Sequence, residues 1–172
     1  MKHQYKYHDR NSNSYTYSHL FKIETIGLRF FTVYGPWGRP DMALFLFTNA
    51  MLNNQPINVF NNGLLSRDFT YIDDIVEGVS NTILKNSVNK NLSKIYNIGN
   101  SKPVKLLDFI LEIENALSIK AEKNMLPMQL GDVYETYADT SRLKNDYDYE
   151  PSTDIKIGIS EFINWFRKYY NK

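Results

Sequence analysis

The sequence predicts an α/β fold with some parallel strands, because short apolar segments alternate along the chain with longer segments of helical periodicity. The clearest case is an apolar run from Leu28, which breaks into a glycine- and proline-rich loop over residues 35–40 and then into an amphipathic pattern. A strand that leads through a donor-rich loop to a helix is a common anion-binding edge in such folds. No linker, repeat or heptad divides the 172 residues, which fit one domain.

Composition excludes several classes of protein. Hydrophobic residues make up 42% of the chain, which supports a folded core, and 20 basic against 19 acidic residues give little electrostatic basis for binding nucleic acid. The absence of cysteine excludes disulfides, thiolate catalysis and cysteine-based metal sites. No apolar run approaches the roughly 20 residues that cross a bilayer, and the N-terminus lacks the apolar core of a signal peptide. We therefore expect a cytoplasmic protein without membrane partners.

The first part of the chain contains one predicted strand between two helical segments. Residues 1–14 are polar without apolar periodicity and are expected to be irregular, whereas residues 15–22 have the apolar spacing of the last turns of a helix. The strand from Leu28 follows. Asp41 then stands where the N-cap of a helix over residues 41–53 is expected.

The middle of the chain continues the alternation. A short strand is expected at residues 57–60, followed by a turn at residues 61–63, where Asn and Gly tolerate positive φ. An apolar stripe of helical spacing begins at about Asp73, with Asp73 or Asp74 as its cap. A β-like segment at residues 94–98 ends at a Gly-Asn pair.

The last part is predicted to be mainly helical. Pro103 is expected to open a helix, because proline is tolerated in the first turn. Residues 126–132 are loop-like, a short helix is expected at 141–147, and a final helix begins at about residue 157, with Trp165 in the core. The predicted strands and helices do not begin with the strand and glycine-rich turn that hold the cofactor in a doubly wound fold. The chain is therefore expected to be the second half of a larger fold of this kind.

A resemblance to a known family lies in three segments, which read Thr32-Val33-Tyr34-Gly35-Pro36, Arg39-Pro40-Asp41-Met42 and Arg67-Asp68-Phe69-Thr70-Tyr71-Ile72-Asp73-Asp74. In these segments the chain resembles the C-terminal half of NAD-dependent sugar-nucleotide epimerases and dehydratases, the extended short-chain dehydrogenase/reductase group, and most of all the UDP-glucuronate 4-epimerase branch. The resemblance runs over residues 17–172 and leaves residues 1–16 outside it. It implies the substrate-binding portion of a partial Rossmann fold.

Two features of the complete family enzyme are missing from these residues. The glycines of this sequence do not have the G-x-G-x-x-G or G-x-x-G-x-x-G spacing of the loop that holds a dinucleotide pyrophosphate. The family enzyme uses a Tyr whose pKa is lowered by a Lys four positions later, and no Tyr in this sequence has Lys at that position. The resemblance would place this Tyr-Lys dyad near His3 and Tyr7. The family enzyme uses NAD, but we expect none to bind this chain alone, and we assign no catalytic or cofactor-binding residue.

The resemblance implies two cationic contacts for a nucleotide sugar. Arg67 would pair with the diphosphate, a task that suits a guanidinium group. The alternative is a surface pair between Arg67 and Asp68. Arg39 would lie near the carboxylate of a uronate sugar, with Thr32 as a hydroxyl partner, the alternative being a loop arginine that caps carbonyl groups.

It also implies contacts to the nucleoside. Phe60, with Val59, matches the apolar wall beside the uracil, although a short strand usually places such residues in the core. Gln129 and Asp132 match the loop that reaches the base and ribose, while Leu130 departs from the proline common there. The alternative for this loop is an ordinary turn.

Other candidate groups have simpler interpretations. Tyr34 and Tyr71 are expected to be packing residues with satisfied hydroxyl groups. The adjacent Asp73 and Asp74 indicate a helix cap and not a metal site. The three histidines show no ligand spacing, so no metal is expected.

Three functional hypotheses follow. In the first, the chain is a truncated UDP-glucuronate 4-epimerase-like protein that binds a UDP-sugar, as the resemblance implies, and has no turnover alone. The complete enzyme interconverts UDP-glucuronate and UDP-galacturonate through a 4-keto intermediate, as in capsule or cell-surface polysaccharide biosynthesis. The alternatives are a non-catalytic sugar-nucleotide binder, a fragment of a related dehydratase or decarboxylase, and a degenerate product with an uncovered apolar face at Leu28. Family enzymes are often homodimers, but the oligomeric state here stays open.

Overall fold

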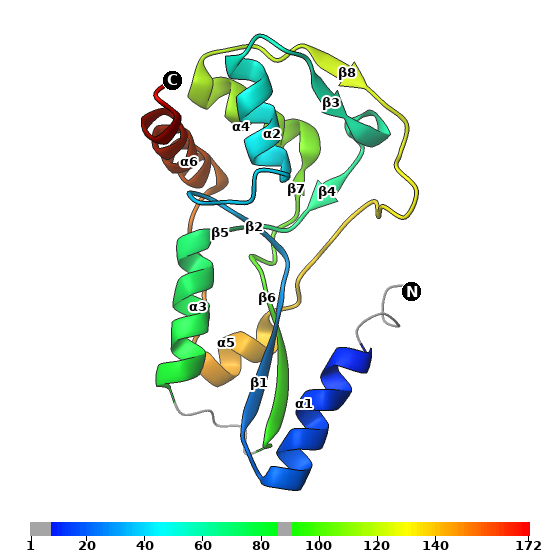
Figure 1. Cartoon of the computed structure of the whole chain (residues 1–172), viewed down its shortest axis with the longest axis vertical. Helices are drawn as coiled ribbons and strands as arrows, with labels where there is room; N and C mark the ends of the chain where they lie inside the picture. The colour runs from blue at the N-terminus through cyan, green and yellow to red at the C-terminus, as the bar shows by residue number, and fades with distance from the viewer. Residues whose placement is uncertain (1–7, 86–90) are drawn as a thin grey trace.

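The computed structural model describes residues 8–85 and 91–172, with side chains described from residue 13 onward. Figure 1 shows two regions stacked along the long axis of the molecule. One is built on the paired strands β1 and β6. The other is formed by α2, α4 and α6 with short strand pairs beside them. The N-terminal helix α1 (His8–Phe21) lies in the first region, and α6 (Ile155–Tyr170), which ends the chain, lies in the second.

The first region is organised by one parallel strand pair. β1 (Thr25–Phe30) pairs with β6 (Ser93–Ile98) over its whole length, from Thr25 opposite Ser93 to Phe30 opposite Ile98. Helices α3 (Ile72–Leu84) and α5 (Ser141–Tyr147) lie to one side of the pair and α1 to the other (Figure 1). A small core of aliphatic and tyrosine side chains fills the space between these helices and strands: Ile75, Tyr96, Ile98, Leu143, Tyr147 and Tyr149.

The second region holds three short strand pairs. β2 (Thr32–Tyr34) and β5 (Phe69–Tyr71) are parallel, as are β3 (Ile57–Val59) and β8 (Lys123–Met125). β4 (Ser66–Arg67) pairs with β7 (Val104–Lys105) in the antiparallel sense. The 3-10 segment η2 (Phe60–Gly63) joins β3 to β4. The pairing of β2 with β5 brings the first and the third of the three sequence segments that carry the family resemblance side by side.

The main core lies where α2 (Ala43–Leu52), α4 (Leu106–Leu117) and α6 meet these strands. One face of α4 packs into the core, because its buried apolar residues recur at helical spacing: Leu106, Phe109, Ile110, Ile113 and Leu117. Phe69 and Phe109 stack with ring centroids 4.0 Å apart, and Tyr34 meets Phe109 edge-on at 6.2 Å. The packing of Tyr34 and Tyr71 is confirmed, since both are buried here. The hydroxyl of Tyr34, however, has no hydrogen-bond partner within the described part of the chain.

Several predicted boundaries are wrong. Residues 8–14 belong to α1, so an irregular segment over 1–14 is wrong for that part, while residues 1–7 lie outside the described residues. Pro103 does not open α4, because β7 intervenes and the helix begins at Leu106. The final helix begins at Ile155, capped by the Asp154 side chain, which accepts from the backbone N–H of Lys156 at 2.9 Å.

The predicted aspartate caps are also wrong. The N-cap residue of α2 is Met42, because the Asp41 carboxylate instead accepts from the guanidinium of Arg39. The N-cap residue of α3 is Tyr71, so Asp73 and Asp74 lie inside the first turn. Asp74 is buried and accepts hydrogen bonds from Thr153, from its backbone N–H at 3.2 Å and its hydroxyl at 3.0 Å. It therefore ties α3 to the segment that precedes α6.

The alternative of a degenerate product implied an uncovered apolar face at the strand from Leu28, and apolar side chains of β1 and α1 are exposed. Among the described strands β1 pairs only with β6, and Phe30 is 53% exposed. The apolar side chains that α1 presents are also largely exposed: Tyr15, Tyr17, Leu20 and Phe21. Within the described residues no helix is long and apolar enough to span a bilayer.

Candidate functional site

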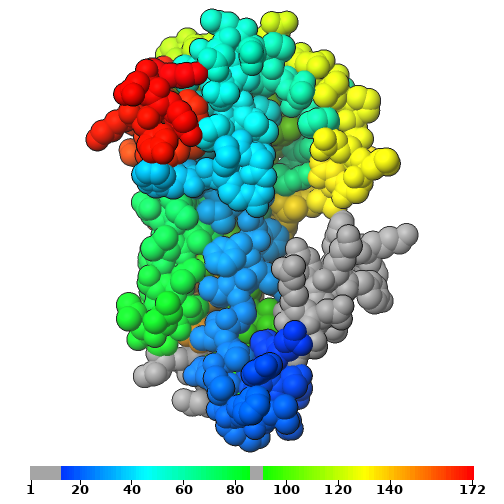
Figure 2. All heavy atoms as spheres, in the orientation of Figure 1, coloured from blue at the N-terminus to red at the C-terminus, as the bar shows by residue number. Residues whose placement is uncertain are grey.

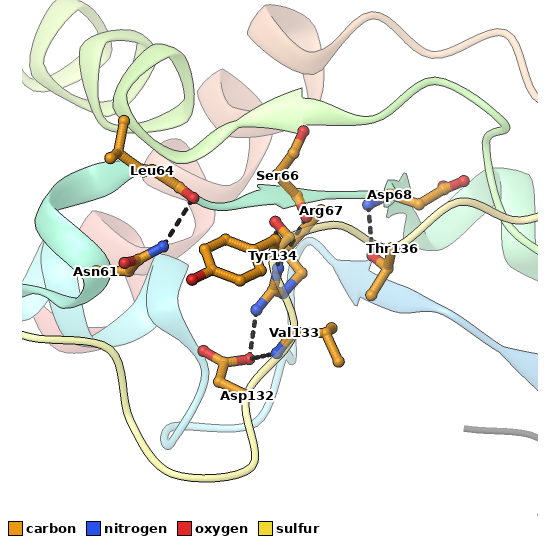
Figure 3. A network of polar contacts seen from close by, with 9 residues as sticks. All are labelled: Asn61, Leu64, Ser66, Arg67, Asp68, Asp132, Val133, Tyr134 and Thr136. Carbon is orange, nitrogen blue, oxygen red and sulfur yellow. Dashed lines mark hydrogen bonds and ion pairs between the residues drawn. The ribbon is translucent and has the colours of Figure 1, made fainter. Parts of the chain in front are cut away.

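Arg67, at the end of β4, is at the centre of the polar network in Figure 3. Its Nη2 donates to Oδ1 of Asp132 at 2.5 Å, and its Nη1 donates to the carbonyl oxygen of Ser66 at 2.8 Å. The Arg67 side chain is 17% exposed and that of Asp132 is 28% exposed. The guanidinium is therefore held in one orientation while part of it still faces solvent.

The loop that contains Asp132 is fixed along β4 by backbone hydrogen bonds. The N–H of Ser66 donates to the Tyr134 carbonyl at 2.8 Å, and the N–H of Thr136 donates to the Ser66 carbonyl at 3.2 Å. Earlier in the loop, the N–H of Asp132 donates to the Gln129 carbonyl at 3.2 Å and closes a tight turn. Gly131 supplies the positive φ (85°) that this turn requires. Gln129 itself is exposed on the turn.

Asp68 is a buried anchor beneath this site. Its carboxylate accepts backbone N–H groups from Asn100 at 2.7 Å, Ser101 at 3.0 Å and Ala138 at 2.9 Å. The alternative of a surface pair between Arg67 and Asp68 is therefore wrong, because Asp68 is fully buried and directed away to these amides. The sequence segment around Arg67 was noticed, but the role of Asp68 was missed, since its partners lie 32 to 70 residues away.

Thr32 and Arg39 line a small cavity of about 30 Å³. Aromatic rings of the core form much of its wall: Tyr34, Phe69, Phe109 and Phe162. Thr32 also donates its backbone N–H to the carbonyl of Asp68 at 3.2 Å, which joins this cavity to the strand that ends in Arg67. Thr32 and Arg67 therefore belong to one edge of the second region.

The Arg39 guanidinium pairs with a neighbouring carboxylate and not with backbone carbonyls. Its Nε donates to Asp41 Oδ1 at 3.0 Å and its Nη2 donates to Oδ2 of the same carboxylate. This hydrogen bonding raises the pKa of Arg39 and lowers the pKa of Asp41 from their ordinary values. Both side chains are more than half exposed, so water screens the pair and its partner can be exchanged.

Phe60 begins η2 and is partly buried against the main core, whereas Val59 before it is fully buried. The loop of Asp132 starts beside them, because the N–H of Leu126 donates to the Val59 carbonyl at 2.9 Å and the N–H of Asn62 donates to the Leu126 carbonyl at 3.1 Å. In Figure 2 this yellow loop forms one rim of the upper region and the surface is hollowed between it and α2. The loop that contains Gln129 and Asp132 therefore starts beside Val59 and Phe60 and reaches Arg67 at Asp132.

The loop before α2, which contains Gly35 and Gly38, packs closely against α3, because a Cβ on Gly35 would lie 2.7 Å from Ile72 Cγ2. The expected dyad positions at His3 and Tyr7 lie outside the described residues. No group of three or more His, Asp and Glu in the described part of the chain could hold a metal ion.

Comparisons with known proteins decide the family. A model described as the NAD dependent epimerase/dehydratase family matches residues 9–99, just over half of the chain. The chain belongs to this family. The match begins before residue 17, where the resemblance was expected to start. The family, predicted from the three sequence segments, and the α/β fold class, predicted from the alternation of strands and helices, are both confirmed.

Curated relatives within the epimerase/dehydratase family include Protein CapI of Staphylococcus aureus, which is 50% identical over 92% of this chain and 52% of that protein. A probable UDP-glucuronate 4-epimerase of Rhizobium meliloti is 40% identical over 92% of this chain and 51% of that protein. The chain thus spans about half the length of the curated relatives that it matches.

Solved structures of the epimerase/dehydratase family place the same fold in ligand complexes. The structure of UDP-glucuronic acid 4-epimerase from Bacillus cereus with UDP-glucuronic acid and NAD superposes with a TM-score of 0.85 at 32% identity. That superposition covers 91% of this chain and 49% of the Bacillus protein.

Proposed function

We propose that this chain contains the UDP-sugar-binding half of a UDP-glucuronate 4-epimerase-like protein. The observation on which this depends is the Arg67–Asp132 pair, which joins a cation from β4 to an acid from the loop over residues 126–136 beside Phe60. A fixed guanidinium next to a carboxylate and an aromatic side chain can distinguish the parts of a nucleoside diphosphate. Relatives named as UDP-glucuronate 4-epimerases support the same assignment.

In this proposal, Arg67 donates to the diphosphate. A guanidinium has five N–H donors, and the protein acceptors of Arg67 use Nη1 and Nη2. The remaining donors can meet phosphate oxygens, for which the planar geometry of the group is suited. Asp132 then keeps Arg67 in position and presents its other oxygen to the ribose hydroxyl groups.

The other proposed contacts are to the carboxylate of the sugar and to the uracil. Arg39 exchanges the carboxylate of Asp41 for that of a uronate sugar, with the Thr32 hydroxyl as a second donor, because both residues line the same cavity. Phe60 covers one face of the uracil, and Gln129, exposed on the turn before Asp132, reaches the polar edge of the base.

We propose no turnover by these 172 residues alone. No Tyr in the sequence has Lys four positions later, and the glycines do not have the spacing of a dinucleotide-binding loop. In the complete protein the interconversion of UDP-glucuronate and UDP-galacturonate would use NAD, and its product would serve capsule or cell-surface polysaccharide synthesis. A non-catalytic UDP-sugar binder is the second candidate, which the missing dyad favours.

Calorimetric titration with UDP-glucuronate tests the proposal. We expect binding by the wild-type chain and a loss of about tenfold or more in affinity for Arg67→Ala, the cost of one charge-assisted contact. Lys105→Ala is the matched control, because Lys105 is an exposed cation on the strand paired with β4. No binding at millimolar ligand, or equal losses in the two variants, would refute the proposal.

UDP-glucose in the same titration separates the candidate substrates. A site for a uronate binds UDP-glucuronate more tightly than the neutral sugar nucleotide, because only the uronate gives Arg39 a carboxylate. Equal affinities would favour a neutral hexose, as in a dehydratase of the same family. Epimerisation of UDP-glucuronate by the purified chain would contradict the claim of no turnover.

A further inference from the structure

Trp37 occupies a backbone position that tryptophan rarely adopts. The N–H of Gly38 donates to the Gly35 carbonyl at 3.1 Å, which defines a β-turn with Pro36 and Trp37 at its two central positions. Trp37 has φ of 62°, in the left-handed region that favours Gly or Asn at the third position of such a turn. A bulky residue persists in this conformation only where surrounding contacts hold it.

Those contacts come from the last turns of α6. The Trp37 ring lies 5.3 Å from the ring of Trp165 and 5.1 Å from that of Tyr169, in tilted and edge-on arrangements. Trp165 and Tyr169 in turn stack on each other with centroids 5.5 Å apart. Trp37 is nevertheless 73% exposed, so its packing is confined to one side. The ring therefore attaches the turn to the helix without being part of the main core.

The turn leads directly to Arg39. Gly38 and Arg39 line the same cavity as Thr32, and Trp37 immediately precedes them. The Arg39 side chain makes the exposed pair with Asp41, and the Arg39 carbonyl accepts the backbone N–H of Met42 at 3.1 Å, at the start of α2. The Trp37 ring attaches this loop to α6, two residues before Arg39.

We infer that Trp37 is a positioning residue for carboxylate recognition: packed against Trp165 and Tyr169, it fixes the turn that places Arg39 at the cavity shared with Thr32. The inference deepens the proposed function and rests on it, since it assigns to the turn the discrimination between a uronate and a neutral sugar. The diphosphate contact at Arg67 lies on β4 and does not depend on this turn.

The test measures two affinities in the full chain, for UDP-glucuronate and for UDP-glucose. Trp37→Gly removes the ring while keeping a residue that accepts positive φ, so the backbone of the turn is not strained. We expect affinity for UDP-glucuronate to fall about tenfold, the equivalent of one charged hydrogen bond, and affinity for UDP-glucose to change by less than about twofold. Trp37→Phe, which keeps an aromatic ring, should restore most of the preference for UDP-glucuronate over UDP-glucose.

Tyr15→Ala is the matched control, because Tyr15 is an exposed aromatic ring on α1, in the other region, and stacks on His19 of the same helix at 6.3 Å. It should leave both affinities unchanged. Tyr169→Ala removes one partner ring of Trp37 from an exposed position. It should reproduce the selective loss of affinity for UDP-glucuronate. The test therefore stays valid even where Trp37→Gly unfolds. Equal weakening of both ligands, or no change in either, would overturn the role of Trp37 while leaving the proposed function intact. Wild-type chain that binds neither ligand would overturn both.

Discussion

Arg67 and Asp132 lie 65 residues apart in the chain and form an ion pair with an N–O distance of 2.5 Å. Arg67 ends the short strand β4, and Asp132 lies in a loop outside the regular elements. The loop of Asp132 reaches Arg67 because its backbone pairs with Ser66 on both sides, through Tyr134 and Thr136. The pair is therefore a product of loop placement, and it fixes the one guanidinium that the proposal gives to the diphosphate.

Asp132→Asn should lower the free energy of unfolding by roughly 1 kcal/mol, because a partly buried charge-assisted hydrogen bond becomes a neutral one. Urea unfolding followed by circular dichroism measures the change. Asp148→Asn is the control, since Asp148 pairs with Lys85 from a side chain that is 79% exposed and should cost under about 0.5 kcal/mol. Equal effects in the two variants would show that the Arg67–Asp132 pair is no stronger than a surface pair.

Asp68→Ala should destabilise the chain by roughly 3–5 kcal/mol, because three buried backbone N–H groups lose their acceptor. These groups belong to Asn100, Ser101 and Ala138, so the change should also loosen the segment that leads to Asp132. Chemical denaturation gives the stability. Asp73→Ala is the control at an exposed acid nearby in sequence and should have a small effect. A cost below about 1 kcal/mol for Asp68→Ala would mean that water replaces the carboxylate.

Glu114 should make stability depend on pH in acid. Its burial raises the pKa, but hydrogen bonds from Lys123, Lys120 and the Ala121 N–H outweigh that effect, and the pKa falls from 4.5 to about 2. Because the folded pKa is lower than the unfolded one, this stabilisation is complete above pH 4.5 and is lost as pH falls towards 2. At most about 3 kcal/mol is involved.

Thermal unfolding of wild type and Glu114→Gln between pH 7 and pH 2 checks this dependence. The difference in melting temperature between the two proteins should be largest near neutral pH and should shrink in acid. Glu112→Gln, on the same helix, leaves the lysine contacts of Glu114 intact and serves as the control. A difference that stays constant with pH would contradict the assignment.

Tyr34→Phe should be neutral or should stabilise by up to about 1 kcal/mol, because it removes a buried hydroxyl without a partner in the described structure. Gly158→Ala should cost about 1–3 kcal/mol, since its Cβ would lie 2.8 Å from the Tyr34 ring and closer still to the hydroxyl. The double variant should lose less than Gly158→Ala alone. Gly27→Ala is the control, with its nearest neighbour at 3.6 Å. Strict additivity would refute the contact.

Regular elements with strong periodicity could be predicted from the sequence. The helix over 141–147 was predicted to the residue, and the strand at 94–98 within one residue, because their apolar side chains repeat at the period of the element. β8 was missed, because all three of its residues are exposed and give no alternation. The cap at Asp41 was predicted wrongly, because propensity does not reveal that Arg39 competes for its carboxylate.

The site residues could be named individually from the resemblance, but their arrangement could not. Arg67 and Asp132 were both predicted, whereas their pairing depends on a long-range backbone contact that leaves no local signal. Trp37 lies in the glycine- and proline-rich loop over residues 35–40, but its role depends on rings in the last turns of α6, more than 120 residues later. Long-range contacts of this kind follow from tertiary packing and not from the local sequence.

The central claim is that Arg67 of this chain receives the diphosphate of a UDP-sugar. Phosphorus NMR of UDP-glucuronate reports on those two phosphates directly. On titration with the wild-type chain, both phosphorus resonances should shift and broaden, while Arg67→Ala at the same concentration should leave them close to their free positions. Phosphorus resonances that are unchanged by the wild-type chain, or that shift equally with Arg67→Ala, would contradict the claim.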